Sequence, residues 1–91
     1  MNKPLQVLIV EDSESDTILL LSLLRQAGYD PQFRRVGTPE ALRTALAAQK
    51  WDLVLSDHSM PGFDSRAALA IVRGVDRDLP FIIVSGMIGD E

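Results

Sequence analysis

The stretch that decides the fold is residues 5–14, LQVLIVEDSE, in which a nearly continuous apolar run ends abruptly in acidic residues. The run at residues 5–10 is short and rich in β-branched side chains, the pattern of a strand buried on both faces of a parallel sheet. Ser13, with Asp16 three residues later, resembles the capping pattern that opens a helix. Apolar residues then recur at helical spacing, and the following glycine favours a helix end. The buried stripe expected for this helix consists of Leu20, Leu23, Leu24 and Ala27.

The same alternation of strand and helix continues along the rest of the chain. The second strand is the weaker one because it carries Arg34 and Arg35, which we interpret as solvated charges. Apolar strands that alternate with helices predict an α/β fold, in which helices cover both faces of a parallel sheet. Further strands are expected at residues 32–36, 53–55 and Phe81–Val84, and further helices from residues 38–39 to about 49 and from Asp64 or Ser65 onward.

Composition narrows the class of protein. The chain has 91 residues, a formal net charge of −4 and no cysteine, so a single domain over residues 1–91 is expected. Without cysteine there is no disulfide scaffold and no thiol nucleophile. The acidic balance argues against direct nucleic-acid binding, and no apolar run approaches the roughly 20 residues of a membrane span. The N-terminus lacks the pattern of a secretory signal, which predicts a cytoplasmic location.

Acidic residues gather where the predicted strands end. Glu11 and Asp12 follow the first strand, Asp57 follows the third and Ser85 the fourth, and ligands of open parallel sheets bind at these carboxyl ends. Two carboxylates about 4 Å apart repel by roughly 4 kcal/mol at an effective dielectric of about 20, so the cluster requires a cation or a proton. Oxygen ligands of this kind suit Mg²⁺. A carboxylate beside such a cation can act as a nucleophile toward phosphorus, and a hydroxyl such as Ser85 could donate a hydrogen bond to the phosphoryl group.

Three segments share one known pattern: residues 7–12 (VLIVED), 53–62 (LVLSDHSMPG) and 81–86 (FIIVSG). In this order and register they resemble the receiver domain of two-component response regulators, of which the chemotaxis receiver is an example. The resemblance spans essentially the whole chain and implies a flavodoxin-like, doubly wound parallel sheet with strand order 2-1-3-4. The family's fifth strand and last helix have no counterpart, so this receiver domain is expected to be C-terminally incomplete.

The resemblance also implies a role for each residue at the strand ends. Asp57 would be the phospho-acceptor, which takes a phosphoryl group from a phosphohistidine of a sensor histidine kinase or phosphotransfer protein. Mg²⁺ would be held by Glu11, Asp12, Asp57 and the backbone carbonyl of Ser59, and Ser85 would be the switch hydroxyl. The domain would then be a phosphorelay switch, read by an output domain or partner, and not an enzyme.

Three departures from the family pattern affect these expectations. Ser65 stands where the family usually has glycine, which predicts a slightly different end of the loop or start of the third helix. Glu11 is longer than the commoner aspartate, which favours a water-bridged contact with the cation. The family's lysine has no counterpart, which leaves open a pseudo-receiver or interaction module that does not accept phosphate. An aspartyl-phosphate hydrolase is less favoured, because no second acidic residue follows Asp57 before Asp64.

Two apolar segments exceed what a simple core requires. Ile18, Leu19 and Leu21 give the first helix more than one apolar stripe. Either this helix packs on two sides within the fold or, as the resemblance implies, Ser15, Ile18 and Leu19 dock a kinase or phosphotransfer helix. Phe81–Val84 is expected to be an unprotected apolar edge, which predicts a dimer or a domain swap through that strand.

Overall fold

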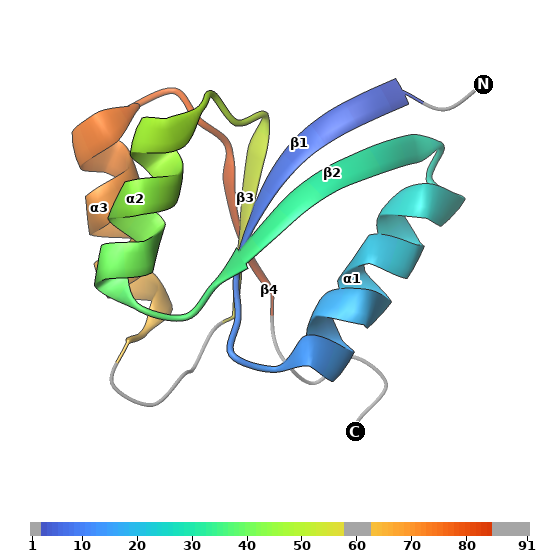
Figure 1. The fold of residues 1–91 in the computed structure, drawn as a ribbon, viewed down its shortest axis with the longest axis horizontal. Coiled ribbons are helices and arrows are strands. Elements are labelled where there is room, and N and C mark those ends of the chain that lie inside the picture. Colours follow the sequence, from blue (N-terminus) through green and yellow to red (C-terminus); the bar gives the residue numbers. More distant parts are fainter. Residues whose placement is uncertain (1–2, 58–62, 85–91) are drawn as a thin grey trace.

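The computed structural model of the protein describes residues 3–57 and 63–84, which form alternating strands and helices as the sequence predicts (Figure 1). The first two strands begin a few residues earlier than expected, at Lys3 and Tyr29. The other boundaries lie close to the predicted ones. The elements are β1 (Lys3–Val10), α1 (Glu14–Gln26), β2 (Tyr29–Val36), α2 (Pro39–Ala48), β3 (Leu53–Asp57), α3 (Ser65–Val75) and β4 (Phe81–Val84).

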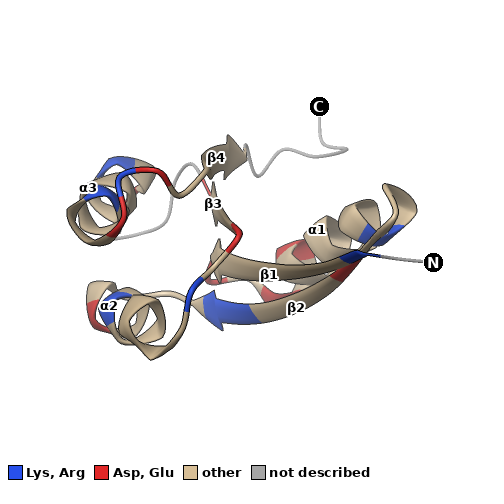
Figure 2. Cartoon of the chain, turned by 90° about the horizontal axis from the view of Figure 1, so that it is seen from above, with Lys and Arg blue, Asp and Glu red and all other residues tan. Residues whose placement is uncertain are grey.

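The four described strands are parallel and lie in the order β2-β1-β3-β4, which confirms the predicted α/β, flavodoxin-like topology. The chain steps from β1 outward to β2 and then crosses back over β1 to β3. Consequently α1 covers one face of the sheet, whereas α2 and α3 lie together on the other (Figures 1 and 2). The strand order reverses between β1 and β3, and this switch point is where open α/β sheets place their ligands.

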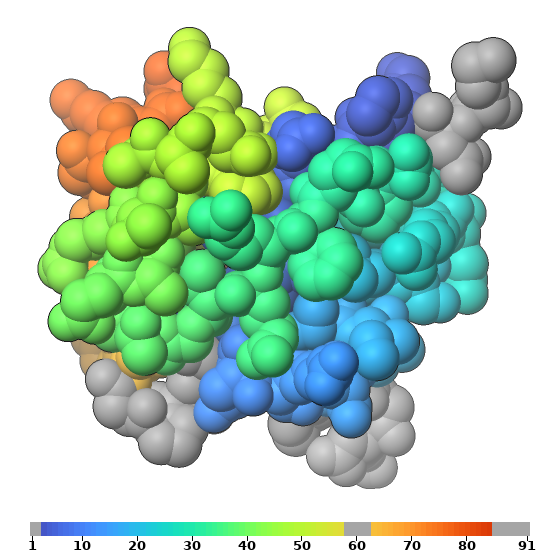
Figure 3. Space-filling view, in the orientation of Figure 1, coloured from blue at the N-terminus to red at the C-terminus, as the bar shows by residue number. Residues whose placement is uncertain are grey.

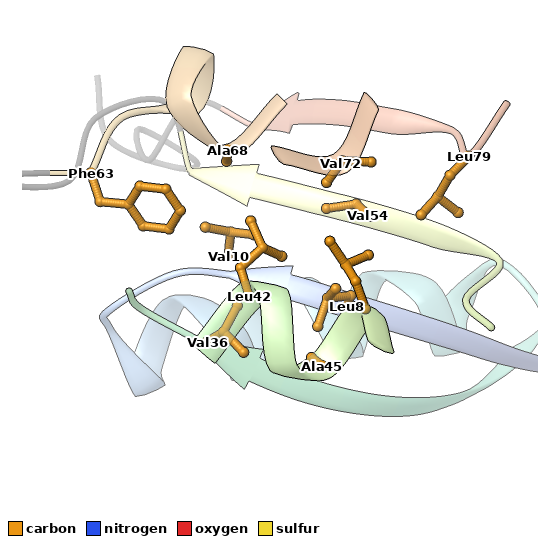
Figure 4. Close-up of a cluster of buried hydrophobic side chains, with 11 residues drawn as sticks. Leu8, Val10, Val36, Leu42, Ala45, Val54, Phe63, Ala68, Val72 and Leu79 are labelled. Carbon is orange, nitrogen blue, oxygen red and sulfur yellow. The ribbon is translucent and has the colours of Figure 1, made fainter. Parts of the chain in front are cut away.

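The side chains of β1 divide the core into two layers. Because successive residues of a strand point to opposite faces, Leu8 and Val10 face α2 and α3, whereas Val7 and Ile9 face α1. All four are essentially fully buried. Burial of each such side chain contributes about 1.5–3 kcal/mol, so the run that opens the sequence is the centre of the core. The layer beneath α2 and α3 is shown in Figure 4.

Each helix begins at a capping side chain that the sequence predicts. Ser13, Thr38 and Asp64 each accept a hydrogen bond from the backbone N–H three residues later, over 3.3, 3.1 and 2.9 Å. Such caps satisfy N–H groups that have no partner within the helix. Of the two alternatives for α3, Asp64 is therefore the cap, and Ser65 is the buried first residue of the helix.

The backbone at the start of α3 shows how the chain accommodates serine at position 65, where the family usually has glycine. Among the described residues only Gly28 has a positive φ, of 99°, where it ends α1 as expected. The backbone at Ser65 therefore needs none of the freedom of glycine. Serine replaces the family's glycine here without backbone strain.

The expected buried stripe of α1 is partly wrong. Leu23 is 44% exposed and Ala27 is exposed, whereas Thr17 and Leu21 are buried beside Leu20. The α1 helix carries apolar residues around more than half of its circumference, so spacing alone fits two stripes. The sheet selects the one centred on positions 17, 20, 21 and 24, and the Thr17 hydroxyl can be buried because it donates a 3.0 Å hydrogen bond to the Ser13 carbonyl.

Two apolar segments remain partly exposed in the described structure. Ile18 and Leu19 on α1 are 59% and 37% exposed, so within the described residues α1 packs on one side only. Ile82 and Ile83 of β4 are about half exposed, and β4 pairs with β3 alone in the described sheet. The dimer expected through β4 stays a prediction. None of the helices in the described ranges combines the length and apolarity that crossing a membrane requires.

Candidate functional site

Three carboxylates meet at the switch point of the sheet, as the sequence predicts. Glu11 and Asp12 follow β1 directly, and Asp57 is the last residue of β3. Val10 pairs with Ser56 in the ladder, which places the residues that follow them side by side. One carboxylate oxygen from each of the three acids can be chosen so that all lie within 4.8 Å of one another.

The three acids differ in burial. Glu11 is only 3% exposed, Asp57 is half-buried and Asp12 is exposed. The Glu11 carboxylate Oε2 accepts a 2.9 Å hydrogen bond from the backbone N–H of Ser13, at the start of α1. Glu11 is therefore turned into the protein, and the cluster meets solvent through Asp12 and Asp57.

Burial raises the pKa of Glu11 from its ordinary value near 4.5 to about 7. The hydrogen bond from the Ser13 N–H opposes this shift, whereas the negative charge of Asp57 and the contact with Asp12 add to it. A carboxyl group with this pKa is partly protonated at neutral pH. The three acids therefore carry more negative charge than the neighbouring groups offset. Either a proton or a bound cation compensates this excess charge.

Two residues next to the acids were not anticipated from the sequence. Ser56 is buried between Val10 and Ile83 of the neighbouring strands, and its Oγ donates a 3.1 Å hydrogen bond to the Asp57 carbonyl. Arg35, expected to be a solvated charge, extends its Nη1 to within 3.4 Å of the Glu11 carbonyl. A polar residue within an apolar strand is the signal for Ser56, whereas only the strand register reveals Arg35.

The donor set fits a hard divalent cation. Carboxylate oxygens are the protein ligands that Mg²⁺ prefers, and this ion normally takes one or two carboxylates and completes its shell with water and phosphate oxygens. The two more accessible acids, Asp12 and Asp57, could ligate such an ion directly. Glu11 lies behind them with one oxygen already bonded to the Ser13 N–H, and the water-bridged contact expected for it stays a prediction.

Two of the residues assigned by resemblance, Ser59 and Ser85, lie outside the described residues, so their roles stay predictions. The three residues expected to dock a partner are all exposed on α1 (Ser15, Ile18 and Leu19). Helix α1 begins two residues after Asp12. The docking candidates therefore lie in the first two turns of the helix that starts at the acidic cluster.

Comparison with known proteins gives one consistent result. Residues 7–91 match the family model of the response regulator receiver domain. The chain is 36% identical over its whole length to the transcription factor SKN7 of Saccharomyces cerevisiae, of which it spans 14%. It is 33% identical over 85 residues to the two-component response regulator ORR41 of Oryza sativa, covering 91% of this chain and 67% of ORR41.

Solved structures agree with the sequence matches. The N-terminal domain of a response regulator receiver protein from Methanoculleus marisnigri aligns with a TM-score of 0.70 at 28% identity, covering 87% of this chain and 64% of that one. The signal receiver domain of a histidine kinase from Syntrophus aciditrophicus aligns with a TM-score of 0.73 at 30% identity, covering 88% and 61%. This chain thus spans less than two thirds of either structure. From its family match, strand order and acidic cluster, the chain belongs to the response regulator receiver domain family.

Proposed function

We propose that this domain is the phospho-acceptor module of a two-component phosphorelay and that Asp57 accepts the phosphoryl group. The observation that carries the proposal is the convergence of Glu11, Asp12 and Asp57 within 4.8 Å at the switch point of the sheet. Of the three, Asp57 combines partial exposure with a backbone fixed in a central strand, β3. A nucleophile needs both access and a fixed direction of attack.

The transfer step requires one bond to form while another breaks. A carboxylate oxygen of Asp57 attacks the phosphorus of a phosphohistidine, the P–N bond breaks, and the departing imidazole nitrogen takes a proton from solvent. The product is an acyl phosphate on Asp57. Mg²⁺, held by Asp12 and Asp57 with Glu11 behind them and with the carbonyl predicted for Ser59, would offset the charge of the phosphoryl oxygens. Ser85 is proposed to donate a hydrogen bond to the transferred group.

The direct test is phosphorylation by a small donor. We expect acetyl phosphate with Mg²⁺ to add one phosphoryl group to the intact chain, detected by mass spectrometry, and chelation of Mg²⁺ to suppress the addition. Asp57→Asn should abolish the labelling. Asp30→Asn is the matched control, because Asp30 is exposed on β2 outside the acidic cluster.

Two outcomes would contradict the proposal. Equal labelling of the Asp57→Asn variant would exclude Asp57 as the acceptor. No labelling of the wild-type chain by acetyl phosphate or by phosphorylated kinases would favour the alternative, a pseudo-receiver that serves as an interaction module without accepting phosphate.

We further infer that the domain works in the cytoplasm as a switch between a sensor histidine kinase or phosphotransfer protein and an output domain, and not as an enzyme. Helix α1 supports a docked partner with the exposed Ser15, Ile18 and Leu19. Asp64, the next acidic residue after Asp57, is engaged as the cap of α3. We therefore expect no turnover of a small ester such as p-nitrophenyl phosphate, and measurable turnover would revive the hydrolase alternative.

A further inference from the structure

We propose that Arg35 is a positioning residue for the acidic cluster: its guanidinium holds the Glu11 carbonyl and so fixes how the chain leaves β1 toward Asp12. This role deepens the proposed function, because it rests on the cation site formed by the same acids. Arg35 touches none of the reacting atoms. It acts through the backbone that carries Glu11 and Asp12.

The strand register places Arg35 for this contact. Arg35 pairs with Ile9, whose side chain faces α1, so Arg35 lies on the same face of the sheet, beside the turn into α1. Its Nη1 reaches the Glu11 carbonyl over 3.4 Å, across 24 residues of sequence. The next residue of β2, Val36, accepts a 3.0 Å hydrogen bond from the Glu11 N–H. Consecutive residues of β2 thus hold both backbone polar groups of Glu11.

The side chain of Glu11 adds a third restraint on the same turn. Its carboxylate accepts the 2.9 Å hydrogen bond from the Ser13 N–H, so the backbone before and after Asp12 is anchored. Ligand geometry for a cation must be held within about 0.5 Å to be effective. Removal of the Arg35 contact should therefore loosen the backbone that carries Asp12, although the carboxylate itself remains present as a ligand.

The neighbouring Arg34 offers a matched control. It pairs with Leu8, whose side chain faces α2 and α3, so its guanidinium projects from the opposite face of the sheet. Both arginines are exposed and carry the same charge. Arg34→Ala removes that charge one residue away and keeps the bond to Glu11, which separates loss of charge from loss of positioning.

The experiment is a calorimetric titration with Mg²⁺ at fixed ionic strength of the wild type and the variants Arg35→Ala, Arg35→Lys and Arg34→Ala. Loss of a positive charge favours cation binding in both alanine variants, whereas loss of positioning weakens it only in Arg35→Ala. We expect Arg35→Ala to bind Mg²⁺ about three- to tenfold more weakly than Arg34→Ala, at or below the lower end of the roughly 10–100-fold effects of groups that orient metal ligands, because Arg35 acts through the backbone. Arg35→Lys has the same charge as the wild type but lacks the planar guanidinium fork, so it should bind Mg²⁺ more weakly than the wild type.

A second measurement does not depend on the cation. In metal-free protein, amide hydrogen exchange at Ser13 should accelerate in Arg35→Ala and stay unchanged in Arg34→Ala, with similar free energies of unfolding for the two variants. Equal Mg²⁺ affinity of the two alanine variants, or equal exchange at Ser13, would overturn the role of Arg35. Absence of Mg²⁺ binding by the wild type would instead overturn the proposed cation site, and Ser13 exchange would still decide whether Arg35 holds the turn.

Discussion

The two faces of the described sheet differ in how many apolar side chains they bury. Within residues 3–57 and 63–84, eleven buried side chains form one continuous cluster on the face covered by α2 and α3, whereas the cluster beneath α1 contains five. Most of the large apolar side chains that remain exposed belong to the α1 face, since they lie on α1 or, by register, point toward that side of β2 and β4. They are Ile18, Leu19, Leu23, Phe33 and Ile82.

This difference allows stability to be tested on one face and the proposed docking of a partner on the other. The face under α2 and α3 supplies most of the buried apolar side chains of the described residues, and the other face carries α1, which begins at the acidic cluster. In Figure 3, β2 and α1 lie next to each other at the surface of the molecule. Among the described residues, the α1 face therefore exposes more large apolar side chains than the opposite face.

The largest expected effect is on stability, and it contrasts one leucine from each face. Leu42 of α2 is fully buried, whereas Leu23 of α1 is 44% exposed. Leu42→Ala should lower the free energy of unfolding by about 2–5 kcal/mol, because it removes contacts and leaves a cavity. Leu23→Ala should lower it by about 1 kcal/mol or less. Urea denaturation measures both, and equal losses would contradict the difference between the faces.

The next effect is the pH dependence that comes from Glu11 at the switch point. Its pKa is raised to about 7 in the folded protein, so between about pH 4.5 and 7 the unfolded chain loses this proton before the folded one does. Stability without divalent cations therefore falls as the pH rises through this range. The loss is fully developed above about pH 7 and amounts to up to roughly 3 kcal/mol.

Glu11→Gln isolates that contribution, because glutamine keeps the shape and an oxygen for the Ser13 N–H but does not titrate. In the presence of a chelator, the variant should gain stability relative to the wild type between pH 5 and pH 8. Denaturation curves at the two pH values measure the gain. The same pH dependence in both proteins would show that Glu11 ionises normally.

Sequence patterns could predict the elements of the fold because the signals are local. The alternation in β1 and the capping residues Ser13 and Thr38 act within a few positions, and the structure confirms them. The convergence of Glu11 and Asp57 was predictable as well. Parallel strands that each end in a carboxylate must bring those carboxylates to one edge.

The wrong and the missed expectations concern contacts that only the assembled sheet defines. Leu21 was expected outside the buried stripe and Leu23 within it, because α1 is apolar enough to fit either rotation. Arg35 was interpreted as a solvated charge and is exposed as expected, but its hydrogen bond to the Glu11 carbonyl, 24 residues away in sequence, was not predicted. A carbonyl leaves no mark in the sequence, so no pattern of residue types predicts such a contact.

The third prediction tests α1 as the docking surface. Ile18→Ser and Leu19→Ser should slow phosphotransfer from the sensor kinase or phosphotransfer protein that labels the wild type fastest, by about tenfold if the contact contributes about 1.4 kcal/mol. Labelling by acetyl phosphate should not change, because this donor needs no docking. Val75→Ser is the control, since Val75 is 58% exposed at the end of α3. An equal loss in the Val75 variant would contradict a specific surface on α1.

The smallest expected effect is on weak self-association through β4. Substitutions on the two faces of this strand can separate the contributions to that association. Ile82 and Ile83 are about equally exposed, but Ile82 pairs with Leu55 of the α1 layer and therefore points to the α1 face, whereas Ile83 points to the face under α2 and α3. If strand pairing were the only contact, Ile82→Lys and Ile83→Lys would weaken the dimer equally. If the apolar α1 face also takes part, Ile82→Lys should weaken the dimer more than Ile83→Lys does, by about 1 kcal/mol or less.

Light scattering over a concentration series measures both variants, and a monomeric wild type at every concentration would contradict association through this strand. A larger effect at Ile82 would show that apolar side chains on the α1 face contribute to self-association in addition to the exposed backbone of β4.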